Sequence, residues 1–197
     1  MNPSYTLACH ARFSVIDFET TGAVAGYRIE PWQVGVVSVE QGVVRGETCY
    51  ESLFRIGDRP FNVRAPGRHA RIRDQLALAP TPSEVLPELV QRLSGVPVVA
   101  HNMGTERSQL LSMAPLHKFG PWVDTLKVTR NAYPSLESKS LEDVIDTLGL
   151  RLRVEALCPG REAHDALYDA VACGVLLEHF LALPGWERVT VEALAEV

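Results

Sequence analysis

Two carboxylates, Asp17 and Glu19, stand at the end of an apolar run in the segment FSVIDFETTG, residues 13–22. Strand side chains alternate between two faces, so both carboxylates point the same way, with Cα atoms about 6–7 Å apart. Carboxylates this close repel each other and raise each other's pKa. Divalent cations would remove the repulsion, and such oxygen ligands suit Mg²⁺ or Mn²⁺ better than zinc. Taken alone, the pair is equally consistent with exposed carboxylates at a fraying strand edge.

A second polar segment, HNMGTE from His101 to Glu106, directly follows the apolar run VPVVA. Ligands of α/β sheets bind beyond the carboxyl ends of the strands, so we expect Glu106, in the first turn of the next helix, to face the same pocket. His101 and Asn102 are expected to cap that helix or to contact substrate. A purely structural, hydrogen-bonded role for His101 is at least as good an interpretation.

A third polar segment, HDALYDA, runs from His164 to Ala170. If all of it were helical, His164 and Asp169 would lie about 140° apart around the helix axis, on poorly matched faces. We therefore expect His164 in the preceding loop and Asp165 as the helix N-cap, with Asp169 facing the site. Because histidine titrates near neutral pH, His164 beside a metal-bound water would be a good general base.

The hydrophobic pattern predicts the elements that position these residues. It indicates strands first, and then helices and strands in alternation, which is typical of an α/β fold with a mixed sheet covered by helices. A turn at residues 40–42 joins two of the strands, and Ser83 and Ser140 are expected to cap helices. The predicted strands span 12–18, 33–39, 43–54, 96–100 and 121–124, and the predicted helices span 83–93, 104–113, 140–148 and 165–182.

The three polar segments occur in an order and with gaps that resemble the DEDDh-type 3′–5′ exonucleases. That family, which includes a bacterial proofreading exonuclease and ribonuclease T, carries the patterns DxETTG, HNxxFD and HxAxxD. Residues 17–22 match the first pattern, and His164, Ala166 and Asp169 match the third. Weaker similarities lie in HARI at 69–72, VDTL at 123–126 and KSLEDV at 139–144. The resemblance spans about residues 12–182, within one exonuclease domain over 1–197.

The resemblance implies a ribonuclease H-like fold with a five-stranded mixed sheet. It also implies a metal-dependent 3′–5′ exonuclease that hydrolyses single-stranded DNA or RNA ends to nucleoside 5′-monophosphates. Two Mg²⁺ or Mn²⁺ ions would be held by Asp17, Glu19, Asp169 and Glu106, with His164 as the general base. The substrate contacts it implies are Thr20, Thr21 and Gly22 against the terminal nucleotide, with Asn102 as a further contact.

Two positions depart from the family pattern. Thr105-Glu106 replaces the Phe-Asp of the second motif, and the extra methylene of Glu106 shifts the reach of its carboxylate by about 1.5 Å. Gln33, in WQVG, stands where the family usually carries an acidic residue. These departures leave an alternative open, namely a non-catalytic module of nuclease fold that binds nucleic acid or a protein partner.

Composition is ordinary for a soluble globular protein, with 46% hydrophobic and 22% charged residues. We see neither a secretory signal nor a membrane-spanning run, and we expect a cytoplasmic protein with reduced thiols. The four cysteines form no CxxC pair, which argues against a zinc site. A net charge of −5 argues against a large nucleic-acid footprint, although the six arginines within residues 55–73 are candidate phosphate contacts.

Overall fold

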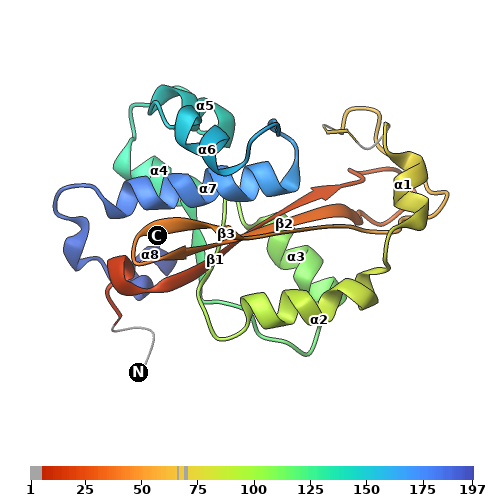
Figure 1. Ribbon diagram of the computed structural model, residues 1–197, viewed down its shortest axis with the longest axis horizontal. Coiled ribbons are helices and arrows are strands. Elements are labelled where there is room, and N and C mark those ends of the chain that lie inside the picture. Colours follow the sequence, from red (N-terminus) through yellow and green to blue (C-terminus); the bar gives the residue numbers. More distant parts are fainter. Residues whose placement is uncertain (1–5, 66, 69–70) are drawn as a thin grey trace.

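A five-stranded mixed sheet in the order β3-β2-β1-β4-β5 forms the centre of the molecule (Figure 1). This computed structural model describes residues 6–65, 67–68 and 71–197. Strands β1 to β3 are antiparallel, whereas β4 runs parallel to both β1 and β5. The predicted α/β class and mixed sheet are thereby confirmed. The strands are β1 Arg12–Thr20, β2 Pro31–Glu40, β3 Val43–Leu53, β4 Val98–Ala100 and β5 Trp122–Asp124.

Strand β1 extends beyond its predicted end at residue 18 and continues to Thr20. Both Asp17 and Glu19 therefore belong to the strand, and pairing with β2 becomes irregular only between Glu19 and Thr20. The turn between β2 and β3 lies where the sequence placed it, with Gln41 at φ 53° and Gly42 at φ 73°. Two successive positive φ values suit the right-handed twist of a two-residue hairpin.

Alternating side chains of β1 divide the core into two layers. Phe13 and Val15 pack with α7, whereas Ile16 and Phe18 belong to the cluster formed with α2 and α3. Asp17 and Glu19 continue the odd-numbered series, so they face the α7 side of the sheet. This parity fixes which helix is able to complete a site with them.

Helices cover both faces of the sheet, with α4 to α7 on one side and α2 and α3 on the other (Figure 1). Helix α7 packs across β1, β2 and β3, and most of its residues are buried. Within the described ranges, every helix falls short of the length and apolar character that a bilayer-spanning segment requires. The helices are α1 Arg73–Leu78, α2 Pro82–Leu93, α3 Gly104–Met113, α4 Thr125–Ala132, α5 Leu141–Thr147, α6 Arg151–Leu157, α7 Ala166–Leu181 and α8 Val191–Ala195.

Two of the predicted helix starts can be compared with their observed caps. The Ser140 hydroxyl accepts a hydrogen bond from the Asp143 N–H at 3.3 Å, so Ser140 caps α5 as predicted. The prediction that Ser83 caps α2 is wrong. Thr81 occupies that position in a capping box with Glu84, because Pro82 at the first helical position moves the helix start one residue earlier.

Candidate active site

Four carboxylates from three elements converge at the carboxyl end of β1. Asp17 and Glu19 come from β1, Glu106 comes from the first turn of α3, and Asp169 comes from the first turn of α7. One ligand atom each from Glu19, Asp169 and His164 lies within 4.8 Å of the other two. The charges of Asp169, Glu106 and Glu19 all act on Asp17. The structure thus brings together every residue that the sequence predicted as a metal ligand.

Burial dominates the electrostatics of this cluster. Burial and the neighbouring carboxylates raise the pKa of Glu19 to about 8 and hold the pKa of Asp17 well above its ordinary value. Burial also raises the pKa of Asp169 to about 7, although a hydrogen bond from the His164 N–H partly opposes it. Among the residues that the structure describes, no lysine or arginine forms an ion pair with any of these three groups, so their mutual repulsion is not relieved by a salt bridge. Bound cations would relieve it.

Among the four carboxylates, Glu106 gives the clearest indication of a metal site. Its side chain is 4% exposed, and burial raises its pKa to about 7. Its Oε2 atom is buried and has no hydrogen-bond partner in the part of the chain that the structure describes. Buried carboxylate oxygens normally have a partner, so an orphaned one points to an ion or water at this position. The substituted Glu106 therefore fits a metal site.

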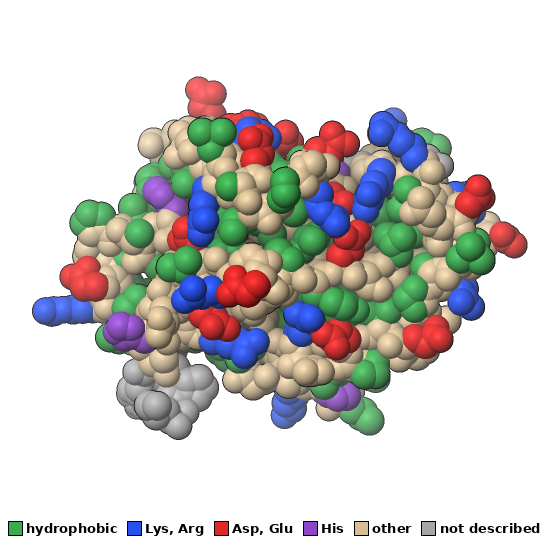
Figure 2. All heavy atoms as spheres, viewed as in Figure 1, with side chains coloured by type: hydrophobic (Ala, Val, Ile, Leu, Met, Phe, Trp, Pro, Cys, Tyr) green, Lys and Arg blue, Asp and Glu red, His purple; other side chains and the backbone are tan. Residues whose placement is uncertain are grey.

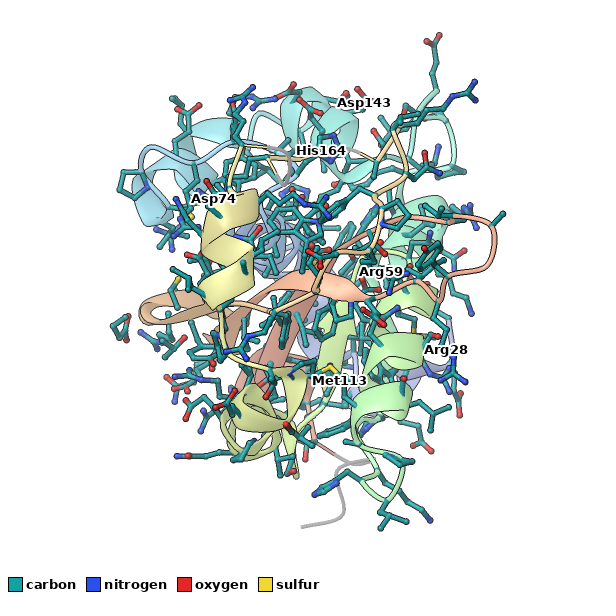
Figure 3. The ribbon with its side chains drawn as sticks, turned by 90° about the vertical axis from the view of Figure 1, so that its right-hand side faces the viewer. Arg28, Arg59, Asp74, Met113, Asp143 and His164 are labelled. Carbon is teal, nitrogen blue, oxygen red and sulfur yellow. The ribbon has the colours of Figure 1, made fainter. Side chains whose placement is uncertain are left out.

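His164 lies in the loop before α7, above the end of the sheet (Figure 3). Its φ of 66° is unusual for a residue with a side chain, and its backbone N–H donates to Asp169 Oδ2 at 2.9 Å. Asp165 caps α7 as predicted, accepting hydrogen bonds from the N–H groups of Leu167 and Tyr168. The exposed His164 ring is free to reach the carboxylates, whereas a helical His164 would have pointed elsewhere.

Gly35 in β2 permits the close contact that delivers Asp169 to the site. It pairs with Asp17 in the sheet and faces the start of α7. A Cβ atom at this position would lie 2.2 Å from the Ala166 carbonyl oxygen, which is inside van der Waals contact. Only glycine allows the first turn of α7 to rest against the strand here.

A network of ion pairs holds the turn before α7, and sequence reasoning did not predict it. Arg161 donates to Asp165 Oδ1 at 2.8 Å and also to the Glu51 carboxylate in β3. Arg68 Nη2 lies 3.1 Å from both Glu51 and Asp165. Burial raises the pKa of Asp165, but Gln33 and these two arginines outweigh it and lower that pKa below its ordinary value. Asp165 is therefore held in its ionised form, which suits its role as the cap of α7.

Gln33 is fully buried at the base of this network. Its Nε2 donates to Glu51 Oε1 at 3.0 Å, and its Oε1 accepts from the Ala166 N–H at 3.3 Å. Gln33 stands in β2 where the family pattern has an acidic residue. The neighbouring strand β3 carries an acid nearby, because Glu51 lies directly across from Gly35. No sequence pattern marks Glu51, because its contact with Arg161 spans 110 positions.

The predicted substrate contacts have different surroundings. Thr20 borders a hollow of about 530 Å³ that Arg28 and Thr105 also line. Thr21 is fully buried, and its hydroxyl accepts from the Glu30 N–H at 3.1 Å. At Gly22, with φ 67°, a Cβ would lie 2.8 Å from the Asn62 Cβ, so this glycine permits close packing against the neighbouring loop.

The segment HN does not cap α3, whose N-cap is Met103. Asn102 is exposed at φ 64°, with its backbone N–H bonded to Asp124 Oδ1 at 2.9 Å. His101 bonds Thr125 Oγ1 at 3.0 Å and the Lys139 carbonyl at 2.9 Å through its two ring nitrogens. The structural interpretation of His101 is therefore the correct one.

Most arginines of the 55–73 segment bind the protein itself. Arg55 donates to the Ala79 carbonyl at 2.9 Å, Arg59 pairs with Glu30 at 2.6 Å, and Arg73 donates to the Arg59 carbonyl at 2.8 Å. With Arg68 also paired, Arg64 and Arg71 are the two arginines of this segment whose exposed side chains have no hydrogen bond or ion pair to the described residues. The HARI similarity begins at His69 and Ala70, which lie outside the described residues.

Comparisons with known proteins identify the family and the fold of this chain. The RNase_T model, described as an exonuclease family, matches residues 14–177. Exonuclease X in complex with 5′ overhanging duplex DNA is 26% identical, with a TM-score of 0.70, and the match covers 93% of this chain and 98% of that one. The nuclease domain of 3′hExo, a DEDDh family member bound to rAMP, is 17% identical, with a TM-score of 0.65 and coverage of 88% and 93%.

A third structure is Pop2p of S. pombe in its Mg²⁺- and Mn²⁺-bound form. It is 14% identical, with a TM-score of 0.66, and the match covers 94% of this chain and 88% of that one. A search of curated proteins finds no match. The ribonuclease H-like fold and the resemblance of the three motifs are both confirmed. The chain belongs to the RNase_T family of exonucleases.

Proposed function

We propose that this protein is a metal-dependent 3′–5′ exonuclease that removes the terminal nucleotides of single-stranded DNA or RNA as nucleoside 5′-monophosphates. The observation that carries the proposal is the convergence of four carboxylates beside an exposed histidine; two of them are buried, two are half-buried, and one buried oxygen has no partner among the described residues. Neighbours of the same fold support a nucleic-acid substrate and a divalent metal, since they are seen with duplex DNA, with rAMP and with Mg²⁺ and Mn²⁺.

Asp17, Glu19, Asp169 and Glu106 would hold two Mg²⁺ or Mn²⁺ ions. When bound, such ions lower the pKa of the attacking water and stabilise the charge on the leaving 3′ oxygen. The donor set fits them, because it consists of carboxylate oxygens, the ligands that these hard cations prefer. The low-dielectric surroundings that raise these pKa values also strengthen any attraction to a cation.

His164 accepts the proton of the attacking water in this proposal. Its ring lies next to the Glu19 and Asp169 oxygens, and its loop position lets it approach from the solvent side. The Asp169 hydrogen bond to the His164 backbone fixes the turn that presents the ring. A neutral imidazole near pH 7 is a suitable base for this step.

Thr20 and Asn102 are the proposed contacts to the terminal nucleotide; Thr20 borders the hollow of about 530 Å³, and Asn102 is exposed in the segment before α3. Thr21 and Gly22 hold the chain next to Thr20 in place. The Thr21 hydroxyl accepts a hydrogen bond from the Glu30 N–H, and the Gly22 backbone packs closely against Asn62. A close-packed wall excludes water and gives the nucleotide a fixed position.

The test is incubation of purified protein with 5′-labelled single-stranded DNA and RNA in Mg²⁺, Mn²⁺ or EDTA, with products separated by length. We expect a ladder that shortens from the 3′ end only when metal is present, and the faster substrate names the strand class. A folded protein that shortens neither strand in either metal would contradict the proposal. The non-catalytic binding module would then be the better assignment.

A further inference from the structure

One face of helix α3 is polar and lines a surface hollow. The hollow has a volume of about 530 Å³, and we call it the Thr20 hollow. Thr20, Arg28 and Ile29 line it from the end of β1 and the segment that follows, and Arg28 lies beside α3 (Figure 3). On α3 its wall consists of four polar side chains at the spacing of a single helix face, namely Thr105, Ser108, Gln109 and Ser112.

Gln109 differs from the other three side chains of this wall because it is buried. It is 7% exposed, whereas Thr105, Ser108 and Ser112 are exposed. Its side-chain amide offers two N–H donors and an acceptor oxygen, yet it forms no hydrogen bond to any residue that the structure describes. Buried polar groups are normally paired. Because Gln109 lines the Thr20 hollow, its unpaired amide is available to a ligand there.

Thr105 makes the character of this wall particular to this chain. It stands where the DEDDh pattern carries a phenylalanine before the acid of the second motif. A phenyl ring at this position would add a large apolar surface to the lining, whereas the exposed threonine adds a hydroxyl. The Thr20 hollow therefore presents hydrogen-bonding groups where the family pattern places an aromatic ring.

The Thr20 hollow adjoins the candidate metal site along the chain. Thr20 directly follows Glu19, and Thr105 directly precedes Glu106, so both walls begin one residue from a proposed metal ligand. In a nucleotide the ribose separates the base from its 5′ phosphate. The base of a nucleotide held by the metals therefore lies beside their ligands and not among them. Ile29, which is 45% exposed, adds apolar surface for the face of a ring.

The charge of the lining also suits a nucleic-acid strand. It contains Arg28 and neither Asp nor Glu. On the face seen in Figure 2, by contrast, acidic and basic side chains are interspersed. A strand whose terminal base enters the Thr20 hollow meets one cation and no carboxylate in the lining, which favours a polyanion.

We propose that the Thr20 hollow binds the terminal nucleobase of the strand and that Gln109 selects adenine there. A glutamine amide bonds adenine at two points, because it accepts from the amino group of the base and donates to the adjacent ring nitrogen. The terminal nucleotide is then removed fastest when its base is adenine. This inference rests on the proposed function, because it concerns the nucleotide that the reaction releases.

The test compares kcat/KM for single strands that differ only in the terminal nucleotide. For the wild type we expect kcat/KM with terminal adenine to be about tenfold above that with the other three bases, the discrimination expected of one bidentate amide contact. Gln109→Leu removes the amide and keeps a good helix former, and it should lose this preference. Gln91→Leu is the matched control and should keep it, because Gln91 is exposed on α2 outside the Thr20 hollow.

A change in the substrate gives a second measurement that does not depend on a folded variant. A strand that ends in unsubstituted purine lacks the amino group of adenine, so the wild type should cut it about tenfold less efficiently than the adenine strand. If the purine and adenine strands are cut alike, or if Gln109→Leu keeps the adenine preference, the inference is overturned.

The outcomes separate the two proposals. If the wild type cuts single strands at rates that do not depend on the terminal base, the proposed function stands and the assignment of Gln109 falls. If the wild type cuts nothing, yet in EDTA binds the adenine strand about tenfold more tightly than the others and Gln109→Leu binds all four alike, the assignment stands and the proposed function falls. A preference for another base in either assay contradicts the selection of adenine, and absence of both cutting and base preference overturns both proposals.

Discussion

At the scale of single residues, the candidate site combines uncommon backbone angles with carboxylates whose ionisation is disfavoured. His164 and Asn102 are two of three described non-glycine residues with positive φ, and both stand at the ends of polar motifs. Asp17, Glu19 and Glu106 are held in surroundings that oppose their ionisation. Such states persist where the surrounding structure imposes them, and they concentrate at functional sites.

Asp17→Asn tests the repulsion directly. We expect it to lower the cleavage rate by more than about 100-fold, because a ligand is lost. We also expect it to raise the unfolding free energy of the metal-free protein at pH 7 by about 1 kcal/mol, because a disfavoured charge is removed. Nuclease assays in Mn²⁺ and thermal melts in EDTA check both effects. Wild-type cleavage by the variant would show that Asp17 is not a ligand.

Glu106→Asp tests whether the site depends on the longer side chain. We expect activity to be retained or raised, since the variant restores the residue that the resemblance implies at this position. Glu106→Gln is the matched control, which keeps the shape and removes the charge, and it should lose activity. Steady-state cleavage rates for both folded variants decide the matter. Complete loss in Glu106→Asp would mean that the pocket is built around the extra methylene.

At the scale of elements, the start of α7 organises the site. Its cap residue, its glycine contact and its paired arginines all serve to place His164 and Asp169 over β1. The sequence predicted this helix and its cap because HDALYDA precedes a long apolar stripe. It did not predict α4 or α6, which are short helices held by tertiary contacts.

Gly35→Ala should disrupt this junction. Its methyl group would overlap backbone atoms of Ala166, which are unable to rotate away as a flexible side chain does. We expect a loss of about 3 kcal/mol in unfolding free energy and a drop in activity from displacement of Asp169. Gly174→Ala is the control, because the new methyl would make only ordinary contacts at 3.4 Å or more. Denaturant melts of the two variants check the contrast, and equal stability would contradict the close contact.

Arg161→Lys tests the network that holds the catalytic turn. Lysine lacks the fork that bonds Glu51 and Asp165 together, so we expect kcat to fall about tenfold while KM stays near the wild-type value. Arg153→Lys is the matched control, since Arg153 pairs with Glu178 at 3.2 Å away from the site. A pH–rate profile adds a second readout, because a general base governs the acidic limb and a displaced His164 would alter that limb. If kcat and the pH–rate profile stayed unchanged, the ion pairs of Arg161 would have only a structural role.

At the scale of the whole molecule, the centre links stability to pH. Folded-state pKa values of about 8 for Glu19 and about 7 for Asp169 and Glu106 lie above the ordinary values. The folded protein therefore retains protons that the unfolded chain has lost, and the stability of the metal-free form decreases as pH rises from about 4.5 toward 8.

Thermal melts at pH 6 and pH 8 measure this linkage. In EDTA we expect the melting temperature to be lower at pH 8 by about 5 °C, equivalent to about 2 kcal/mol. With Mn²⁺ the difference should shrink or reverse, because metal binding is favoured once the ligands have lost their protons. Glu19→Gln is the control and should flatten the dependence in EDTA. A melting temperature that rises with pH in EDTA would contradict the raised pKa values.

The sequence by itself determined the α/β class and the long strands and helices, and it singled out four carboxylates and His164, which the structure places near one another, as candidate site residues. It did so because local periodicity and three ordered motifs are properties of short segments. Only the tertiary structure decided that Thr21 and His101 are held by hydrogen bonds within the protein, that Arg55, Arg59 and Arg68 bind the protein, and that Glu51 supports the turn before α7. These outcomes depend on which residues distant in sequence become neighbours, and strand pairing and helix packing determine that only in the folded chain.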